Sequence, residues 1–139
     1  MKNFYSTFKY FITFLLILLF NFSVKSQCTS GPYGQYPTST YTPSCGAGFQ
    51  TITSCGYRGE YSVISVTTGN TYTFQSSISS DYITITDGSN SPLVYGYGNQ
   101  TWVATYDGTV RFYNHVDDLC NYTSGCMVRS VECVAGGPA

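Results

Sequence analysis

Short runs of β-branched and aromatic residues fill the chain after residue 26, with turn residues between them and no amphipathic helical stretch. Runs of this length with period-two alternation predict strands. The predicted strands are 49–54, 60–66, 71–76, 81–86, 93–97, 100–105, 109–115 and 127–133. The pair 60–66 and 71–76 is predicted to form a hairpin. About eight short strands favour an all-β fold, a two-sheet antiparallel β-sandwich or jelly roll.

The segment 81–92 can be interpreted either as an ordinary half-buried strand with a turn or as part of a ligand-binding site. Its two isoleucines, Ile83 and Ile85, are predicted to face the core. Three alternating side chains are predicted to face solvent: Tyr82, Thr84 and Thr86. An Asp-Gly turn follows the strand. A half-buried strand accounts for most of this segment without any chemistry, while a ligand role stays open for Asp81 and Asp87.

Residues 1–26 have the pattern of a secretory signal peptide. Lys2 and Lys9 give a basic start before the apolar run, and Val24 and Ser26 lie at −3 and −1 of a cut before Gln27. The apolar run is shorter than the ~20 residues that a membrane span needs, which favours cleavage over anchoring. The exported part is predicted to contain three segments: a Gly/Pro/Ser/Thr-rich arm at 27–48, a β-sandwich domain at 49–133 and a linker-like tail at 134–139.

All of the cysteines lie in the exported part of the chain, namely Cys28, Cys45, Cys55, Cys120, Cys126 and Cys133. An even number of cysteines in a secreted chain predicts disulfides, although spacing alone leaves fifteen connectivities. Zinc is disfavoured, because no CxxC occurs and His115 is the only histidine. We therefore expect a disulfide-stapled fold in which a disulfide tethers the arm.

Charge is sparse in the exported part, and this excludes some functions. Three arginines, seven acidic residues and no lysine give it a formal net charge of −4. Such a chain has little with which to neutralise phosphates, so no nucleic-acid partner is expected. No catalytic residue is nominated either: G-x-S-x-G is absent, and nothing pairs His115 with a nucleophile. The sequence does not predict an enzyme.

Four segments, taken in order, carry a resemblance to a known family: GEYSVISVTTGNTYTF, SDYITITDGSNSPL, YDGTVRFYNHVDDLC and VRSVEC. Together they resemble a β-sandwich module that is repeated in large secreted and cell-surface proteins of gliding and environmental bacteria. Such modules are often exported by the type IX system and are similar to the pre-peptidase C-terminal and CUB-like domains. The resemblance covers about residues 28–133.

The resemblance implies a non-catalytic role in adhesion, binding or spacing. It also implies four family cysteines, at 28, 45, 120 and 133, so that the two additional ones, Cys55 and Cys126, are expected to pair with each other. This chain has one such module and lacks the C-terminal sorting domain of type IX cargo. We therefore expect either a piece of a longer protein or export by another route.

Calcium is a candidate ligand. Some CUB domains hold one ion with a Glu and two Asp residues from separate loops, and the resemblance implies Glu60, Asp81 and Asp117 or Asp118 here. Extracellular modules bind calcium at ~10⁻⁴ to 10⁻³ M with few oxygen ligands. The alternative is that these acids cap turns and keep a lysine-free surface soluble.

Aromatic residues are more numerous than one small core can absorb, with twelve tyrosines and Trp102 after residue 26. Flat rings beside hydroxyl groups suit carbohydrate contacts. The candidate ligand-binding residues are Tyr82, Tyr95, Tyr97, Trp102, Tyr106 and Tyr113. The competing interpretation is that aromatic and threonine side chains pair across strands and only stabilise the sheets.

These observations predict a secreted or cell-surface, non-catalytic module for adhesion or ligand binding. Its expected partner is an extracellular glycan or a surface protein. The alternative is a calcium-stabilised, CUB-like protein-interaction or spacer domain within a larger surface protein. No stable membrane anchor is expected after signal cleavage.

Overall fold

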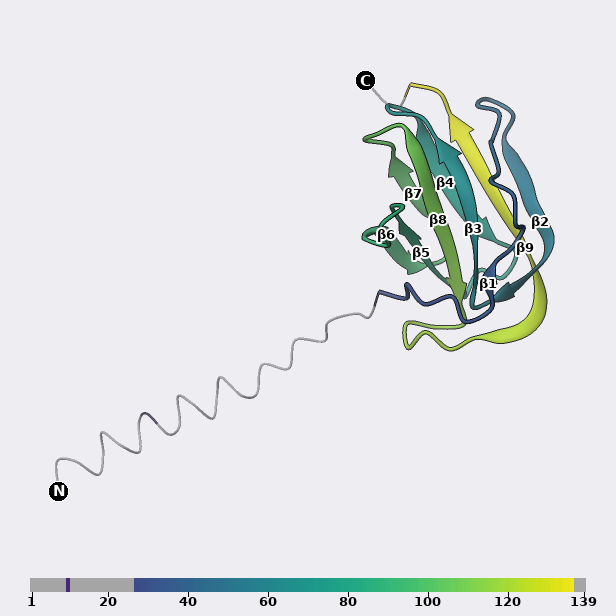
Figure 1. Cartoon of the computed structure of the whole chain (residues 1–139), viewed down its shortest axis with the longest axis vertical. Coiled ribbons are helices and arrows are strands. Elements are labelled where there is room, and N and C mark those ends of the chain that lie inside the picture. Colours follow the sequence, from purple (N-terminus) through teal and green to yellow (C-terminus); the bar gives the residue numbers. More distant parts are fainter. Residues whose placement is uncertain (1–9, 11–26, 137–139) are drawn as a thin grey trace.

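The computed structural model describes residue 10 and residues 27–136 (Figure 1). The predicted signal peptide, apart from Tyr10, lies outside the described residues, as does the end of the predicted tail at 137–139. Within the part of the chain that is described, no helix is long and apolar enough to cross a membrane.

The described residues form nine strands, and each strand predicted from the sequence is among them. Their bounds are β1 Gly34–Gln35, β2 Phe49–Arg58, β3 Glu60–Val66, β4 Thr71–Ser76, β5 Tyr82–Thr86, β6 Pro92–Tyr97, β7 Gln100–Val103, β8 Gly108–His115 and β9 Thr123–Val134. β2 and β9 run several residues beyond their predicted ends, and β1 is an additional short strand within the arm.

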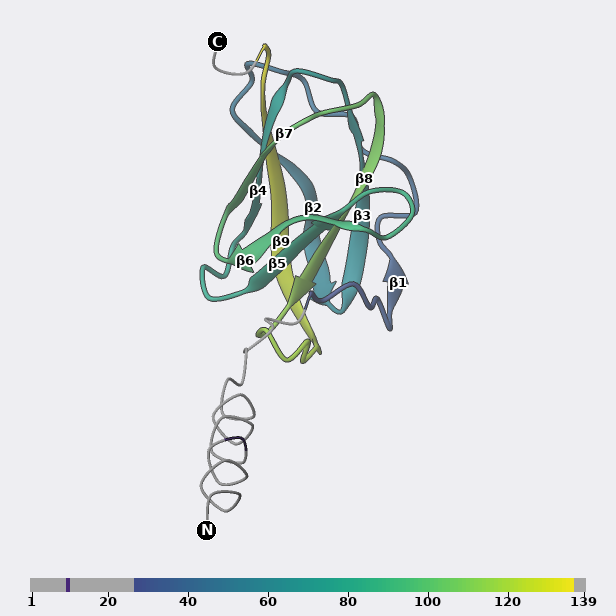
Figure 2. The ribbon, with the colours of Figure 1, turned by 90° about the vertical axis from the view of Figure 1, so that its left-hand side faces the viewer.

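The strands form two sheets packed face to face, which confirms the predicted β-sandwich. One sheet has the order β6-β5-β8-β3-β1, and the other has the order β2-β9-β4-β7. Figure 2 shows the two layers, with β4 and β7 on one side and β3 and β8 on the other. A single parallel pair, Arg58–Glu60, joins β2 to β3 where the chain passes through Gly59 from one sheet to the other.

β3 and β4 do not form the predicted hairpin. β3 pairs with β8, whereas β4 pairs with β7 and β9 in the opposite sheet. Ile64 of β3 and Phe74 of β4 both belong to the shared core, so burying both apolar faces places the two strands in facing layers. The connecting turn bonds to a third segment instead: Gly69 N–H donates to Ala104 O, and Ala104 N–H donates to Asn70 O, both at 2.8 Å.

The core lies between the two sheets. It consists of Ile52, Ile64, Val66, Tyr72, Phe74, Ile83, Ile85, Ala104, Val110, Phe112, Val131 and Cys133. Phe74 and Phe112 meet edge to face across the layers, with ring centroids 5.4 Å apart. Each large apolar side chain removed from water in this way stabilises the fold by roughly 1.5–3 kcal/mol before entropic costs.

The middle of the arm, residues 34–41, pairs along the edge of β3. Besides β1, Tyr41 forms a parallel bridge with Ile64: its N–H donates to Val63 O and its O accepts from Ser65 N–H, both at 2.8 Å. Disulfides fix both ends of the arm, which confirms the expected tether. The described residues contain three disulfides and no free cysteine: Cys28–Cys120, Cys45–Cys133 and Cys55–Cys126. The expected pairing of Cys55 with Cys126 is thereby confirmed.

The prediction that β5 exposes one of its faces is wrong. Ile83 and Ile85 face the core as expected, but Tyr82, Thr84 and Thr86 are also fully buried. We call residues 27–31, at the start of the arm, the strap. The strap lies over the outer face of β5 and β8, where Thr29 O and Ser30 O bond to side chains that border that face. The alternation of side chains along β5 was correctly predicted. The position of the strap, which comes from a distant part of the chain, was not.

Candidate functional site

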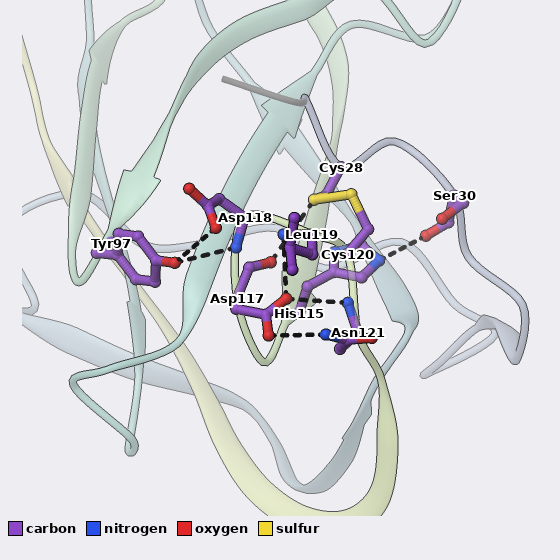
Figure 3. Close-up of a disulfide and its surroundings, with 9 residues drawn as sticks. All are labelled: Cys28, Ser30, Tyr97, His115, Asp117, Asp118, Leu119, Cys120 and Asn121. Carbon is purple, nitrogen blue, oxygen red and sulfur yellow. Dashed lines mark hydrogen bonds between the residues drawn. A yellow bond between two sulfur atoms is a disulfide. The ribbon is translucent and has the colours of Figure 1, made fainter. Parts of the chain in front are cut away.

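Residues 116–122 connect β8 to β9 at the end of the sandwich that we call the loop end (Figure 1). Asp117 organises this loop: its Oδ1 accepts hydrogen bonds from the N–H groups of Leu119 and Asn121, at 3.0 and 3.2 Å. Its Oδ2 accepts from Asn121 Nδ2 at 2.8 Å (Figure 3). These hydrogen bonds lower the pKa of Asp117, and the bond from the Asn121 side chain has the largest effect. The Cys28–Cys120 disulfide fixes the loop to the strap.

The loop presents apolar side chains to solvent. Leu119 is 78% exposed and Tyr122 is 54% exposed. Tyr97, at the end of β6, is 50% exposed and is held beside the loop by Asp118: its hydroxyl donates to Asp118 Oδ1 at 3.0 Å and accepts from the Asp118 N–H at 3.1 Å (Figure 3). Exposed rings whose positions are fixed in this way lose little entropy when they bind.

Tyr122 also belongs to a group of tyrosines from three segments. Tyr33 meets Tyr122 edge to face with centroids 5.4 Å apart, and it meets Tyr57 at 6.1 Å. Tyr122 lies directly on Gly59, where an added Cβ would be 2.8 Å from the Tyr122 Cβ and the φ angle is +98°. We call Tyr33, Tyr97, Leu119 and Tyr122 the loop-end surface. Of these, only Tyr97 was predicted from the sequence. The signal for Leu119 and Tyr122 was a leucine and a tyrosine within a long polar loop, and Tyr33 lies in the arm.

The structure divides the six predicted aromatic ligands into three groups. Tyr95 and Tyr97 are exposed on the outer face of β6, as predicted. Trp102 and Tyr106 are half-buried and pack against the core, with centroids 5.7 Å apart. Tyr82 and Tyr113 are at most 2% exposed, so their predicted exposure is wrong. Burial raises the pKa of both tyrosines.

The acids proposed for calcium do not assemble into a site. Glu60 Oε2 accepts from the Tyr57 N–H at 2.8 Å and pairs with Arg129 at 3.3 Å. Asp81 Oδ1 pairs with Arg58 Nε at 2.7 Å. Among the described residues, no group of three His, Cys, Asp or Glu side chains is close enough to hold a metal ion. Arginine side chains thus neutralise Glu60 and Asp81, two of the acids that were predicted to bind calcium.

Asp117 and Asp118 also have other hydrogen-bond partners. Asp117 accepts hydrogen bonds within its own loop, and Asp118 accepts one from the Tyr97 hydroxyl. They lie on the connection between β8 and β9, whereas Glu60 and Asp81 are among the buried polar residues of the sandwich. All four acids of the predicted calcium set thus have other partners, and no three of them come together in the described residues.

Arg129 is the polar residue that sequence reasoning missed most clearly. It is fully buried on β9, and its guanidinium group reaches four partners. Nη1 donates to Tyr36 O at 3.0 Å and to Ser62 Oγ at 2.7 Å. Nη2 donates to Tyr57 O at 2.8 Å and to Glu60 Oε2 at 3.3 Å. Burial lowers the pKa of Arg129 to about 10, and the side chain joins the arm, β2, β3 and β9.

His115 has no arrangement suited to catalysis. It is fully buried at the end of β8, and its Nε2 lies 3.0 Å from Ser30 O of the strap. Burial lowers the pKa of His115 below its ordinary value, which favours the neutral ring. The neutral tautomer that donates from Nε2 fits this contact, and His115 therefore helps to hold the strap.

The internal pairing of the arginines leaves a negative surface. Arg58 and Arg129 form ion pairs, and the guanidinium carbon of Arg111 lies 5.3 Å from the centre of the Tyr61 ring. Five acids in the described residues have no arginine or lysine ion-pair partner: Asp87, Asp107, Asp117, Asp118 and Glu132. Two of them are in the loop at the loop end, so charge complementarity there favours a cationic partner.

No protein-family model matches the chain, and no curated protein matches it. Among solved structures, the chain is similar to PliG, a periplasmic inhibitor of g-type lysozyme from Aeromonas hydrophila. The two share 13% identity over 68% of this chain and 96% of that chain, with a TM-score of 0.43.

Proposed function

We propose that this protein is an extracytoplasmic, non-catalytic binding module whose loop-end surface docks onto a basic protein surface. The observation that carries the proposal is the exposure of Tyr97, Leu119 and Tyr122 around a loop that a disulfide and Asp117 hold in place. Binding energy in protein interfaces concentrates in a few such aromatic and aliphatic side chains. Three disulfides support an oxidising location outside the cytoplasm.

Charge supports the choice of partner. Asp118 lies beside the Tyr97 ring, and no arginine or lysine of the described residues forms an ion pair with it. A lysine or arginine side chain from a partner would find a carboxylate and an aromatic face together. A basic partner would also associate faster at low ionic strength, because the two surfaces carry opposite charge.

The test is affinity capture from the medium of the source cells, followed by titration of the purified captured protein. We expect Leu119→Asp to weaken binding by about tenfold or more, since loss of an apolar anchor from an interface typically costs over 1 kcal/mol. Val103→Asp, on the exposed face of β7, is the matched control and should leave the affinity unchanged. Equal binding by both variants would refute the proposed surface.

Carbohydrate binding is the second candidate, and the arrangement of Tyr95 and Tyr97 supports it. Both rings project from the outer face of β6, and both hydroxyls are held: Gln27 Nε2 donates to Tyr95 OH at 3.3 Å, and Tyr97 OH donates to Asp118. Two adjacent fixed rings provide a platform for stacking sugar rings. Titration with soluble oligosaccharides should show binding that Tyr95→Ala and Tyr97→Ala abolish. Binding to none of the sugars would exclude this candidate.

A further inference from the structure

The outer face of β6, β5 and β8 carries a continuous layer of rings and polar groups. Cross-strand register places them in two neighbouring rows: Tyr97, Tyr82 and His115, then Tyr95, Thr84 and Tyr113. The two tyrosines on β6 form the exposed edge of this layer, and the other four side chains are buried. The strap runs along the layer from Tyr95, which bonds to Gln27, to His115, which bonds to Ser30 O, and to Tyr113, which lies beside Gly31.

The strap is held almost entirely by side chains. Asn90 Nδ2 donates to Thr29 O at 3.1 Å, and His115 Nε2 bonds to Ser30 O at 3.0 Å. Gly34 N–H of β1 donates to Gly31 O at 2.9 Å, and among the described residues no backbone hydrogen bond joins residues 27–31 to β5, β6 or β8. The other links are the hydrogen bond from Gln27 Nε2 to Tyr95 OH at 3.3 Å and the Cys28–Cys120 disulfide. A segment held in this way opens more easily than a strand in a ladder.

Three buried polar atoms of this layer have no hydrogen-bond partner among the described residues: Tyr82 Oη, Thr84 Oγ1 and His115 Nδ1. Buried polar groups are normally paired, because an unpaired one loses its hydration without compensation. Uncovering the layer would let all three form hydrogen bonds. This gain offsets part of the cost of lifting the strap, and it distinguishes the layer from an ordinary core.

The chemistry of the hidden layer indicates its ligand. Aromatic rings stack on the apolar faces of sugars, while hydroxyl and imidazole groups bond to sugar hydroxyls. We propose that the strap is a displaceable cover over a carbohydrate-binding surface formed by Tyr82, Thr84, Tyr113 and His115, with Tyr95 and Tyr97 at its open edge. This inference rests on the carbohydrate function proposed above and extends it beneath the strap.

The test releases the strap without changing the layer. The double variant Cys28→Ser/Cys120→Ser removes the disulfide that attaches the strap. The control, Cys55→Ser/Cys126→Ser, removes a disulfide elsewhere in the fold. We expect faster amide hydrogen exchange in residues 27–31 of the first variant alone. We also expect its buried tyrosines to ionise closer to the ordinary pKa, because burial is what raises it.

Binding is then titrated with soluble oligosaccharides of β-linked glucose, N-acetylglucosamine and xylose. The strap-released variant should bind about tenfold or more tightly than the wild type, because a closed cover lowers apparent affinity by the open fraction. Adding Thr84→Val to that variant should reverse the gain while leaving Tyr95 and Tyr97 intact. Should both disulfide variants unfold, Gly31→Ala serves instead: its Cβ would lie 2.8 Å from Tyr61 Cδ1 and 3.4 Å from Tyr113 Cε1, and all disulfides remain.

Two results would overturn the proposal. If residues 27–31 stay protected from exchange in the released variant, the strap is not a displaceable cover. If they open and affinity does not rise, the hidden layer is not a binding surface. In either case, wild-type binding that Tyr97→Ala removes would leave the simpler carbohydrate function standing at the exposed edge, so the two failures are distinguishable.

Discussion

At the scale of single residues, the fold depends on how Arg129 is accommodated. A buried guanidinium group is costly unless its donors and its charge are satisfied. Carbonyl oxygens of Tyr36 and Tyr57 and the carboxylate of Glu60 satisfy most of its donors. Gly56 provides the space, since a Cβ there would lie 3.0 Å from both Cζ and Nη2 of Arg129.

We therefore expect Gly56→Ala to destabilise the protein by about 1–3 kcal/mol, because overpacking at a fixed buried group cannot relax easily. Chemical denaturation measures the change. Gly125→Ala is the matched control: it lies on β9 with nothing within 4 Å of an added Cβ. Its effect should remain within about 0.5 kcal/mol. Equal effects of the two substitutions would contradict the role assigned to Gly56.

His115 should make stability depend on pH. Burial lowers the pKa of its imidazole in the folded state, so the unfolded chain takes up a proton first as the pH falls. Stability should be fully present above the unfolded pKa of about 6.5 and should decline as the pH falls towards the folded pKa. Denaturation midpoints at pH 7.5 and 5.5 measure this, and His115→Gln should remove most of the difference. A wild-type midpoint that is equal or higher at pH 5.5 would contradict the expectation.

The burial of Arg129 and the identity of its partners are difficult to predict from the sequence. Arg129 alternates with Met127 and Val131, whose side chains are buried, so its inward position follows from the strand pattern. Residue type argues the other way, because arginine is rarely buried without a partner. The partners come from Tyr36, Tyr57 and Glu60, far away in the sequence, and only the fold brings them together.

At the scale of elements, β5 is covered on both sides and offers a comparison between two threonines. Thr84 Oγ1 has no hydrogen-bond partner in the part of the chain that the structure describes, whereas Thr86 Oγ1 donates to Asp87 O at 3.0 Å. Thr84→Val should therefore be neutral or should stabilise the protein by up to about 1 kcal/mol, and Thr86→Val should destabilise it by about 1 kcal/mol. Thermal unfolding of the two variants measures both changes. A loss of stability in Thr84→Val that matches Thr86→Val would show that Thr84 is satisfied.

Strand positions were predictable, but the partners of the strands were not. Alternation in 60–66 and 71–76 fixes two strands and their inward residues. A short turn between them suggested a hairpin, yet both inward faces must be buried, and the strands lie in opposite sheets. The strap was equally hidden from sequence reasoning, since a polar arm gives no sign of which face it will cover. The exposed part of the candidate site, Tyr95 and Tyr97, was predicted because the chain has more aromatic residues than one small core can bury.

At the scale of the whole molecule, three disulfides span separations of 92, 88 and 71 residues. Each is expected to contribute ~2–4 kcal/mol, largely by restricting the unfolded chain. Full reduction in dithiothreitol, with six thiols then detected, should therefore lower the denaturation midpoint strongly. A midpoint that is unchanged after complete reduction would contradict this expectation.

The disulfide pattern also determines how the module would respond to tension. The described chain begins near the loop end and finishes at the opposite end of the sandwich (Figure 1). From Cys28 a covalent path crosses to Cys120 and reaches Cys133 through only 13 residues of backbone. Even with every strand pulled apart, the distance between Cys28 and Cys133 could grow only to roughly 50 Å, from about 3.5 Å per residue and the 5.3 Å between the Cα atoms of Cys28 and Cys120. Joined in series to other parts of a surface protein, the module would transmit load as a nearly inextensible link.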